Sequence, residues 1–170
     1  MTLDRLRPLA DRALRPFVSL ATALGLSPDA VSVVAFLLAV AAAATFYLGD
    51  LWYLLGAVLV FANGWLDLLD GALARERGTD SAAGDLLDHV LDRYADIAIV
   101  AGLAAGVGRY ALGFAAITGV LMTSYLGTQA QAVGVERVYG GLLGRADRLA
   151  LVGIVAALAP FVPAPGSLSI

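Results

Sequence analysis

The chain has 170 residues, of which 60% are hydrophobic and 15% charged, and its mean hydropathy is +0.84. Soluble globular domains are closer to half apolar, so the composition predicts an integral membrane protein without a separate soluble domain. The absence of cysteine excludes disulfides, thiolate metal sites and a cysteine nucleophile, and a single histidine excludes an all-histidine metal site. There are 14 acidic residues and 11 basic ones, and all 11 basic residues are arginine. Because charged side chains are expensive within a bilayer, the positions of the acidic residues need an explanation.

Residues 1–26 precede the first long apolar run and intersperse leucines with arginines at helical spacing. This pattern is typical of an amphipathic helix that lies in the membrane interface. Pro8 and Pro16 are expected to divide this helix into pieces, because proline removes a helical hydrogen bond. Ser27, which is followed by Pro28, then predicts the start of the next helix, with Ser27 as its N-cap.

Five apolar segments follow, and a membrane span requires roughly 20 apolar residues. They cover 30–48, 51–74, 84–107, 109–130 and 149–162, and the last is short. The expected fold is an all-α integral membrane bundle of five or six transmembrane helices, preceded by the N-terminal interfacial helix. Arginines gather before the first segment, after the second and after the fourth, with Arg109 alone on the opposite side. The positive-inside rule then predicts a cell-membrane protein whose amino terminus and arginine-rich loops are cytoplasmic.

Six aspartates lie in the cytoplasmic halves of the second and third segments: Asp67, Asp70, Asp85, Asp88, Asp92 and Asp96. Asp67 and Asp70 are three residues apart, and Asp88 and Asp92 are four apart, so each pair shares one helix face. Carboxylates that converge at low dielectric repel one another unless cations lie between them. Oxygen ligands of this kind suit Mg²⁺ or Mn²⁺, and the pattern therefore predicts a metal site.

Ion pairing is the alternative explanation for these acids. Arg75, Arg77 and Arg93 are close in sequence, but the acids outnumber them, which favours metal binding. Asp85 falls in the first turn of its segment, where an acid is stabilised by the helix dipole. Asp96 is expected either to pair with Arg93 or to line the cavity.

The segment that runs from Asp67 to Asp92 reads DxxDGxxAR, then eight residues, then GxxxDxxxD. It resembles the signature of the CDP-alcohol phosphatidyltransferases, with every fixed position filled and the spacing intact. The resemblance extends from Ser27 onward, and it implies that residues 27–170 form the transferase domain and residues 1–26 a juxtamembrane helix. Members of this family usually have a sixth span, and this chain stops about where that span would start.

The resemblance implies transfer of a phosphatidyl-type group from a CDP-linked lipid to an alcohol, with release of CMP. Carried over by position, four aspartates would hold two divalent cations, Mg²⁺ or Mn²⁺: Asp67, Asp70, Asp88 and Asp92. Asp92 would also be the general base that takes the proton of the acceptor hydroxyl. The residues implied in CDP-lipid binding are Asp29, Ser32, Asp70, Gly71, Arg75 and Ser81. Gly71 would let the cytidine approach the helix backbone, and Arg75 would pair with the diphosphate.

Arg145 and Arg148 resemble the paired arginines of the branch whose acceptor already carries a phosphate, and two arginines three residues apart can clamp one phosphate. The implied acceptor is a polyol phosphate such as inositol phosphate or glycerol phosphate. Residues 127–131 depart from the inositol-phosphate members, which often carry basic residues late in the fourth span. A non-phosphorylated acceptor such as serine or inositol is the alternative, and the arginines would then serve topology and headgroup contact.

Two other classes of function fit part of the pattern. An intramembrane prenyltransferase also uses aspartate-rich motifs and Mg²⁺, but it needs more spans than 170 residues allow. A non-enzymatic carrier of divalent cations would account for the aspartates, but it gives no role to Gly71 or Arg75.

The lack of lysine and the pI near 4.9 are typical of a salt-adapted, archaeal proteome, in which the donor would be CDP-archaeol. CDP-diacylglycerol is the alternative donor. The family resemblance further implies a homodimer within membrane lipid, and we expect no nucleic-acid partner.

Overall fold

The computed structural model describes residues 7–78, 81–135 and 144–162, and every regular element within these ranges is helical. The elements are α1 (Arg7–Ala23), α2 (Pro28–Leu48), α3 (Trp52–Arg77), α4 (Ala82–Gly106), α5 (Tyr110–Ala132), α6 (Arg145–Leu158) and the 3₁₀ turn η2 (Ala159–Phe161). The predicted all-α fold class is thereby confirmed. Arg137 and residues 163–170, where a sixth span was expected to start, lie outside the described residues.

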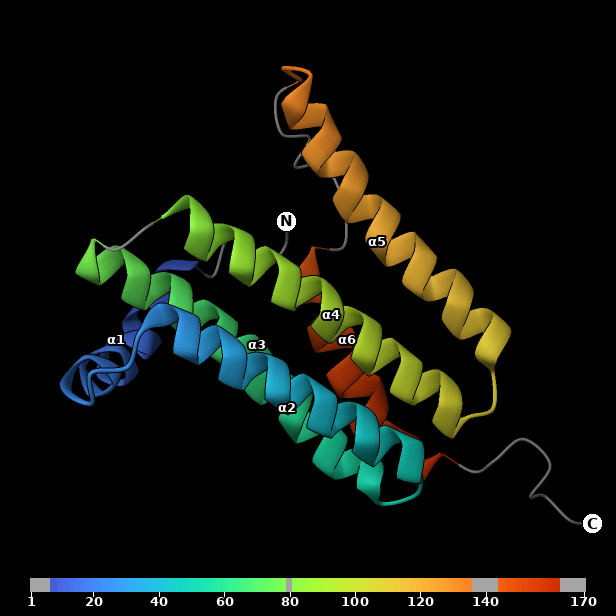
Figure 1. Cartoon of the computed structure of the whole chain (residues 1–170). Helices are drawn as coiled ribbons and strands as arrows, with labels where there is room; N and C mark the ends of the chain where they lie inside the picture. The colour runs from blue at the N-terminus through green and yellow to red at the C-terminus, as the bar shows by residue number, and fades with distance from the viewer. Residues whose placement is uncertain (1–6, 79–80, 136–143, 163–170) are drawn as a thin grey trace, which may run out of the picture.

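The centre of the molecule is formed by α2, α3 and α4: α2 packs against both of the others and runs in the same direction as α4, and α3 runs in the opposite direction (Figure 1). α6 packs against α3, and α1 lies against α3 at one end of the bundle. α5 packs on α4 and then extends away from the other helices. The central core consists largely of small residues, including Ala39, Ala42, Ala57 and Ala95, and it also contains the fully buried Phe46. Small side chains allow these helices to approach closely, as is usual in membrane bundles.

Serine caps fix the starts of the two helices that flank the bundle's polar end. The Ser27 hydroxyl accepts a hydrogen bond from the Ala30 N–H at 3.2 Å, which confirms the predicted cap, and Pro28 opens α2. The Ser81 hydroxyl accepts one from the Gly84 N–H at 3.0 Å and starts α4. Gly78 ends α3 with a left-handed backbone, φ 59°. The connection between α3 and α4 is short, so the two halves of the aspartate motif lie on two antiparallel helices that both pack against α2.

The expected break of the N-terminal helix at Pro16 is wrong, because α1 continues through this residue. Its buried side, Leu14, Val18 and Ala21, packs against the end of α3, and Phe17 meets Trp65 edge to face at a centroid distance of 5.5 Å. This burial offsets the hydrogen bond that proline removes from the helix interior.

Glycine permits a close contact between the backbones of α2 and α4. A Cβ at Gly102 of α4 would overlap the backbone of Ala43 on α2. In contrast, a Cβ at Gly119 of α5 would meet no atom within 4 Å. α2 and α4 are therefore in backbone contact at Gly102, a distance that only glycine allows.

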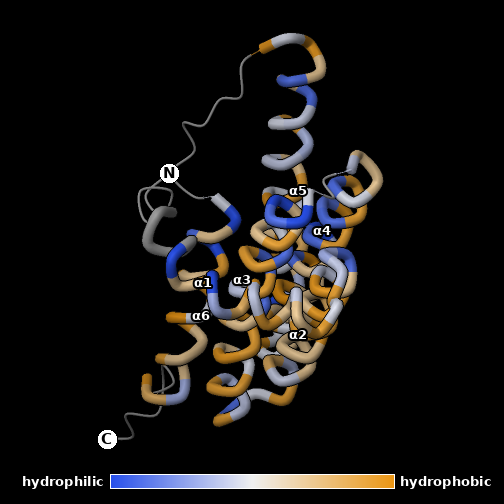
Figure 2. The backbone as a smooth tube through the Cα atoms, turned by 90° about the vertical axis from the view of Figure 1, so that its left-hand side faces the viewer, coloured by the Kyte–Doolittle hydropathy of each residue, from blue (hydrophilic) through white to orange (hydrophobic). Residues whose placement is uncertain are grey.

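Among the residues that the structure describes, three helices are long and apolar enough to cross a membrane, namely α2, α3 and α5, in keeping with an integral membrane protein. The tube of α2 is mainly hydrophobic, whereas hydrophilic stretches appear at α1 and along α4 (Figure 2). α4 is of spanning length but carries four aspartates, including Asp88 and Asp92 of the motif. α6 has 14 residues, fewer than the roughly 20 of a typical span.

Candidate active site

A cavity of about 360 Å³ opens between the first turns of α2 and α4 and the last turns of α3. The six residues expected to contact the CDP-lipid all line it: Asp29, Ser32, Asp70, Gly71, Arg75 and Ser81. Sequence reasoning missed other residues of the wall, among them Ser27 and Arg77. The two serine caps fix where α2 and α4 begin, and Gly78 fixes where α3 ends. These three helix ends lie together and place the side chains around the cavity.

Two of the predicted residues of this cavity, Ser32 and Ser81, already form hydrogen bonds with other groups of the protein. The Ser32 hydroxyl donates to Oδ2 of Asp70 at 2.7 Å, and both side chains are buried. Ser81 uses its hydroxyl to cap α4. A Cβ at Gly71 would meet only the Nη1 atom of Arg75, at 3.4 Å, so the space above Gly71 belongs to the cavity.

Three of the four predicted metal ligands form a tight group beside the cavity. Asp67 and Asp70 on α3 and Asp88 on α4 each offer a carboxylate oxygen, and these oxygens lie within 4.8 Å of one another. Asp92 is outside this group, although it lines the same small pocket as the other three. The sequence prediction of four converging aspartates is therefore matched by three close carboxylates and a neighbouring fourth.

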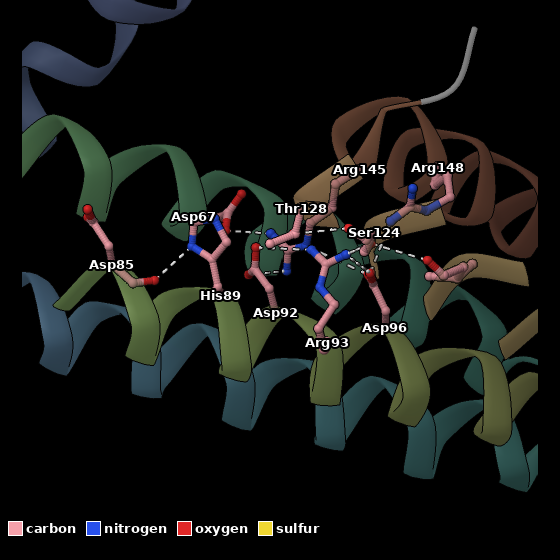
Figure 3. Close-up of polar contacts among 11 residues, drawn as sticks. Asp67, Asp85, His89, Asp92, Arg93, Asp96, Ser124, Thr128, Arg145 and Arg148 are labelled. Atoms are coloured by element: carbon pink, nitrogen blue, oxygen red, sulfur yellow. Dashed lines mark hydrogen bonds and ion pairs between the residues drawn. The ribbon is translucent and has the colours of Figure 1, made fainter. Parts of the chain in front are cut away.

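Arg145, the first residue of α6, points into this carboxylate pocket (Figure 3). Its guanidinium contacts Asp67, lies 2.8 Å from Oδ1 of Asp92 and 3.7 Å from Oδ1 of Asp96. Arg148, one turn along α6, places Nη2 3.0 Å from Oδ2 of Asp96. The two arginines thus lie at the site as expected from sequence, each held by aspartates of the neighbouring helices.

The motif aspartates do form ion pairs, but mostly with Arg145, which was not among the arginines expected to pair with them. Arg93 lies 3.7 Å from both Asp92 and Asp96. Among the described residues, Arg75 and Arg77 form no ion pair with the motif aspartates, whose main partner is Arg145.

Two further buried polar residues belong to the site, and one of them, Asn63, was not expected from the sequence. Asn63 lies one helical turn before Asp67; its Nδ2 donates to the Ala35 carbonyl at 2.8 Å, and its buried Oδ1 has no hydrogen-bond partner. Asp96 is 6% exposed and contacts three arginines, one of which is Arg93, so the expected pairing of these two residues is confirmed. The signal for Asp96 was available in the sequence, since Asp88, Asp92 and Asp96 repeat every four residues along one face of α4.

The carboxylate group has the composition of a hard-cation site. Divalent cations such as Mg²⁺ and Mn²⁺ prefer oxygen ligands, and carboxylates are the usual protein donors. Within the described residues, Asp70 and Asp88 form no ion pair, so no arginine neutralises them. The donor set therefore fits a divalent cation.

Comparison with known proteins agrees with this chemistry. Residues 25–164 match the family model described as CDP-alcohol phosphatidyltransferase. The chain is 36% identical over 151 residues to the archaetidylinositol phosphate synthase of Methanothermobacter thermautotrophicus, covering 88% of this chain and 74% of the relative.

Two crystal structures of the Mycobacterium tuberculosis phosphatidylinositol phosphate synthase match the fold, each with a TM-score of 0.76. One has CDP-DAG bound; it is 34% identical and the match covers 92% of this chain and 82% of that chain. The other is a complex with manganese and citrate, 32% identical, with coverage of 91% and 78%.

Proposed function

The chain belongs to the CDP-alcohol phosphatidyltransferase family, and we propose that it transfers a phosphatidyl or archaetidyl group from a CDP-linked lipid to a polyol phosphate, releasing CMP. One observation carries this proposal. The cavity that holds the predicted nucleotide residues adjoins the carboxylate pocket, and Ser32, Asp70 and Asp88 line both. A diphosphate bound in the cavity would therefore lie next to the carboxylates.

In this proposal the cavity binds the CDP end of the donor lipid. Gly71 leaves room for the cytidine against the backbone of α3, and the exposed guanidinium of Arg75 faces the diphosphate. Asp29 and Ser32 close the wall on the side of α2. The hydrogen bond from Ser32 orients Asp70, so that the second oxygen of this carboxylate remains available.

Asp67, Asp70 and Asp88, with Asp92 beside them, would hold two divalent cations, Mg²⁺ or Mn²⁺. Such cations, when bound, neutralise the diphosphate and make CMP a better leaving group. The crystal structure of the mycobacterial relative in complex with manganese supports this assignment. The protein side of the site contributes carboxylate oxygens from two helices, α3 and α4, which converge at this point.

Asp92 would act as the general base. The acceptor hydroxyl gives its proton to the Asp92 carboxylate, its oxygen bonds to the lipid-side phosphorus, and the bond from that phosphorus to the CMP oxygen breaks. Arg145 and Arg93 lie on either side of Asp92, at 2.8 Å and 3.7 Å. These contacts hold the carboxylate in place between the cavity and α6.

Arg145 and Arg148 would bind the phosphate of the acceptor. The relatives named above are synthases of inositol phosphate lipids, and we therefore place inositol phosphate first among the acceptors. Glycerol phosphate is second, because residues 127–131 lack the basic residues expected of inositol-phosphate members. Serine and inositol are the alternatives without a phosphate.

We further propose the arrangement of the chain in the cell membrane. The segment 1–26, of which α1 is the described helix, would lie in the membrane interface, and residues 27–170 would make up the transferase domain, with spans at α2 to α6 and the active site on the cytoplasmic side. The apolar window of α5 is 6% buried, so lipid or a second copy of the chain would cover it. A homodimer, usual in the family, is consistent with this exposure.

The decisive experiment supplies purified protein in lipid nanodiscs with Mn²⁺ and either CDP-archaeol or CDP-diacylglycerol. Inositol phosphate, glycerol phosphate, serine and inositol are offered separately, and CMP release and the lipid product are measured. The proposal expects CMP release that requires a polyol phosphate. If no acceptor yields CMP while the protein carries Mn²⁺ into liposomes, the cation-carrier function is supported instead.

A further inference from the structure

Asp96 is a buried carboxylate at which three arginines meet (Figure 3). Arg148 lies 3.0 Å from its Oδ2, Arg93 lies 3.7 Å from the same oxygen, and Arg145 lies 3.7 Å from Oδ1. Arg93 comes from α4, as Asp96 does, and the other two come from α6. We call Arg93, Arg145 and Arg148 the arginine triad.

The charges of this cluster do not balance at Asp96 alone. One carboxylate faces three guanidinium groups, which leaves two positive charges unless Asp67 and Asp92 also contribute. Those two aspartates belong to the pocket in which the proposed function places cations and proton transfer. Once they are engaged there, the arginine triad has Asp96 as its remaining carboxylate.

Arg145 has unused hydrogen-bonding capacity. Its Nε atom is buried and makes no hydrogen bond, whereas Nη1 contacts Asp67. A buried guanidinium donor is normally satisfied, so the Nε atom indicates that a further acceptor belongs beside it. A phosphate monoester carries close to two negative charges at neutral pH, which equals the excess charge of the triad over Asp96.

The spacing along α4 gives the order of the groups. Asp88, Asp92 and Asp96 are successive every four residues on one helix face, and four residues of α-helix rise about 6 Å. Asp88 belongs to the cavity that would hold the donor diphosphate, and Asp92 would receive the hydroxyl proton. An acceptor phosphate at Asp96 would then lie about 6 Å from its reacting hydroxyl, a separation that small polyol phosphates can span.

We propose that Asp96 is a positioning residue that gathers Arg93, Arg145 and Arg148 into a binding site for a doubly charged phosphate monoester on the acceptor. This inference rests on the proposed function, and it adds Asp96 and Arg93 to the two arginines already considered. Arg93 is held on its far side by Ser124 of α5, to whose hydroxyl its Nη1 donates. The site is therefore assembled from α4, α5 and α6.

The test compares Asp96→Asn with Asp50→Asn, which changes an exposed aspartate in the turn between α2 and α3. Steady-state kinetics are measured for inositol phosphate and for the CDP-lipid. We expect the acceptor KM of Asp96→Asn to rise about tenfold, as for the loss of one charge-assisted hydrogen bond, with the CDP-lipid KM unchanged. Asp96→Glu, which restores the charge, should recover part of the loss.

The direction in which the acceptor KM changes shows whether Asp96 positions the arginines or only reduces their net positive charge. Removing a carboxylate adds one net positive charge, so an acceptor KM that falls would mean that Asp96 merely competes for the arginines, and the proposal would be overturned. An unchanged KM, or equal changes in both KM values, would overturn it as well. If Asp96→Asn fails to fold, Arg93→Gln carries the same test.

A binding measurement without turnover accompanies the kinetics. Inositol phosphate should raise the unfolding temperature of Mn²⁺-loaded wild type and Asp50→Asn, and at the same concentration the rise should be smaller in Asp96→Asn while Mn²⁺ affinity is retained. Equal protection of all three proteins would contradict the inference. A wild-type protein that releases no CMP with any acceptor refutes the proposed function, whereas wild-type activity with an unaltered Asp96→Asn refutes only the role of Asp96.

Discussion

Nη2 of Arg145, the first residue of α6, lies 2.8 Å from Oδ1 of Asp92 on α4. The same guanidinium contacts Asp67 of the close carboxylate group. A side chain expected to bind the acceptor therefore also provides a positive charge among carboxylates proposed to bind cations. Cation binding and Arg145 compete for these oxygens, because each is stabilised by the same negative charge.

This competition predicts the effect of Arg145→Gln. Mn²⁺ affinity should increase about tenfold, because Asp67 and Asp92 no longer share their charge with a guanidinium; this factor corresponds to the free energy of one charged hydrogen bond. The acceptor KM should rise in the same variant. Titration of Mn²⁺ monitored by electron paramagnetic resonance measures the first effect. Arg109→Gln, at an exposed position between α4 and α5, is the matched control. Weaker Mn²⁺ binding in Arg145→Gln would show that the arginine organises the carboxylates instead of competing for them.

Gly71→Ala tests the cavity without disturbing the fold. The added Cβ meets only the mobile end of Arg75 and occupies the space proposed for the cytidine. We expect an unchanged unfolding temperature and a CDP-lipid KM raised about tenfold, since forcing a methyl group into a filled site costs about 1–3 kcal/mol. Gly64 also lies on α3, and a Cβ there would make an ordinary contact with Leu149 of α6. The control variant Gly64→Ala should therefore leave the CDP-lipid KM unchanged. A normal KM in Gly71→Ala would place the cytidine elsewhere.

Gly102→Ala tests the packing of the bundle. Its Cβ would overlap the backbone of Ala43, so α2 and α4 would have to separate, at a cost of about 1–3 kcal/mol. Gly119→Ala, where a Cβ has open space, should be neutral or slightly stabilising because alanine favours helix. Thermal unfolding in detergent measures both, and equal unfolding temperatures would contradict the close contact of α2 with α4.

The chain has no cysteine, so single-cysteine variants can report its orientation without background. Ala23→Cys and Val135→Cys lie next to arginine-rich segments, and Asp50→Cys lies at the other end of α2. A thiol reagent that cannot cross membranes should label Asp50→Cys in intact cells and the other two only after lysis. The reverse pattern of labelling would invert the proposed topology.

The sequence predicted those parts of the site that depend on local geometry. Helical periodicity placed Asp67 with Asp70 and Asp88 with Asp92, and capping chemistry located the start of α2 at Ser27. The cavity follows from these, because a short connection brings the end of α3 to the start of α4. Helix propensity failed at Pro16, where burial of Leu14 and Val18 outweighs the lost hydrogen bond.

What the sequence could not predict depends on packing between distant segments. Arg145 lies 53 residues beyond Asp92 in the chain, and its contact with this aspartate exists because α6 packs on α3 beside α4. The role of the buried Asn63 could likewise not be predicted from its sequence spacing, because its hydrogen-bond partner is a backbone carbonyl of α2. Sequence periodicity identifies which side chains share a face of one helix, but not which helix covers that face.

Metal binding and turnover measured together in aspartate variants test the central claim most directly. Wild type and the control Asp50→Asn should bind two Mn²⁺ ions and release CMP when a CDP-lipid and a polyol phosphate are supplied. Asp88→Asn should lose both cation binding and turnover, and Asp92→Asn should release CMP about a hundredfold more slowly, as expected for loss of a general base. Wild-type Mn²⁺ binding and wild-type CMP release in both Asp88→Asn and Asp92→Asn would contradict the assignment of these carboxylates as the active site.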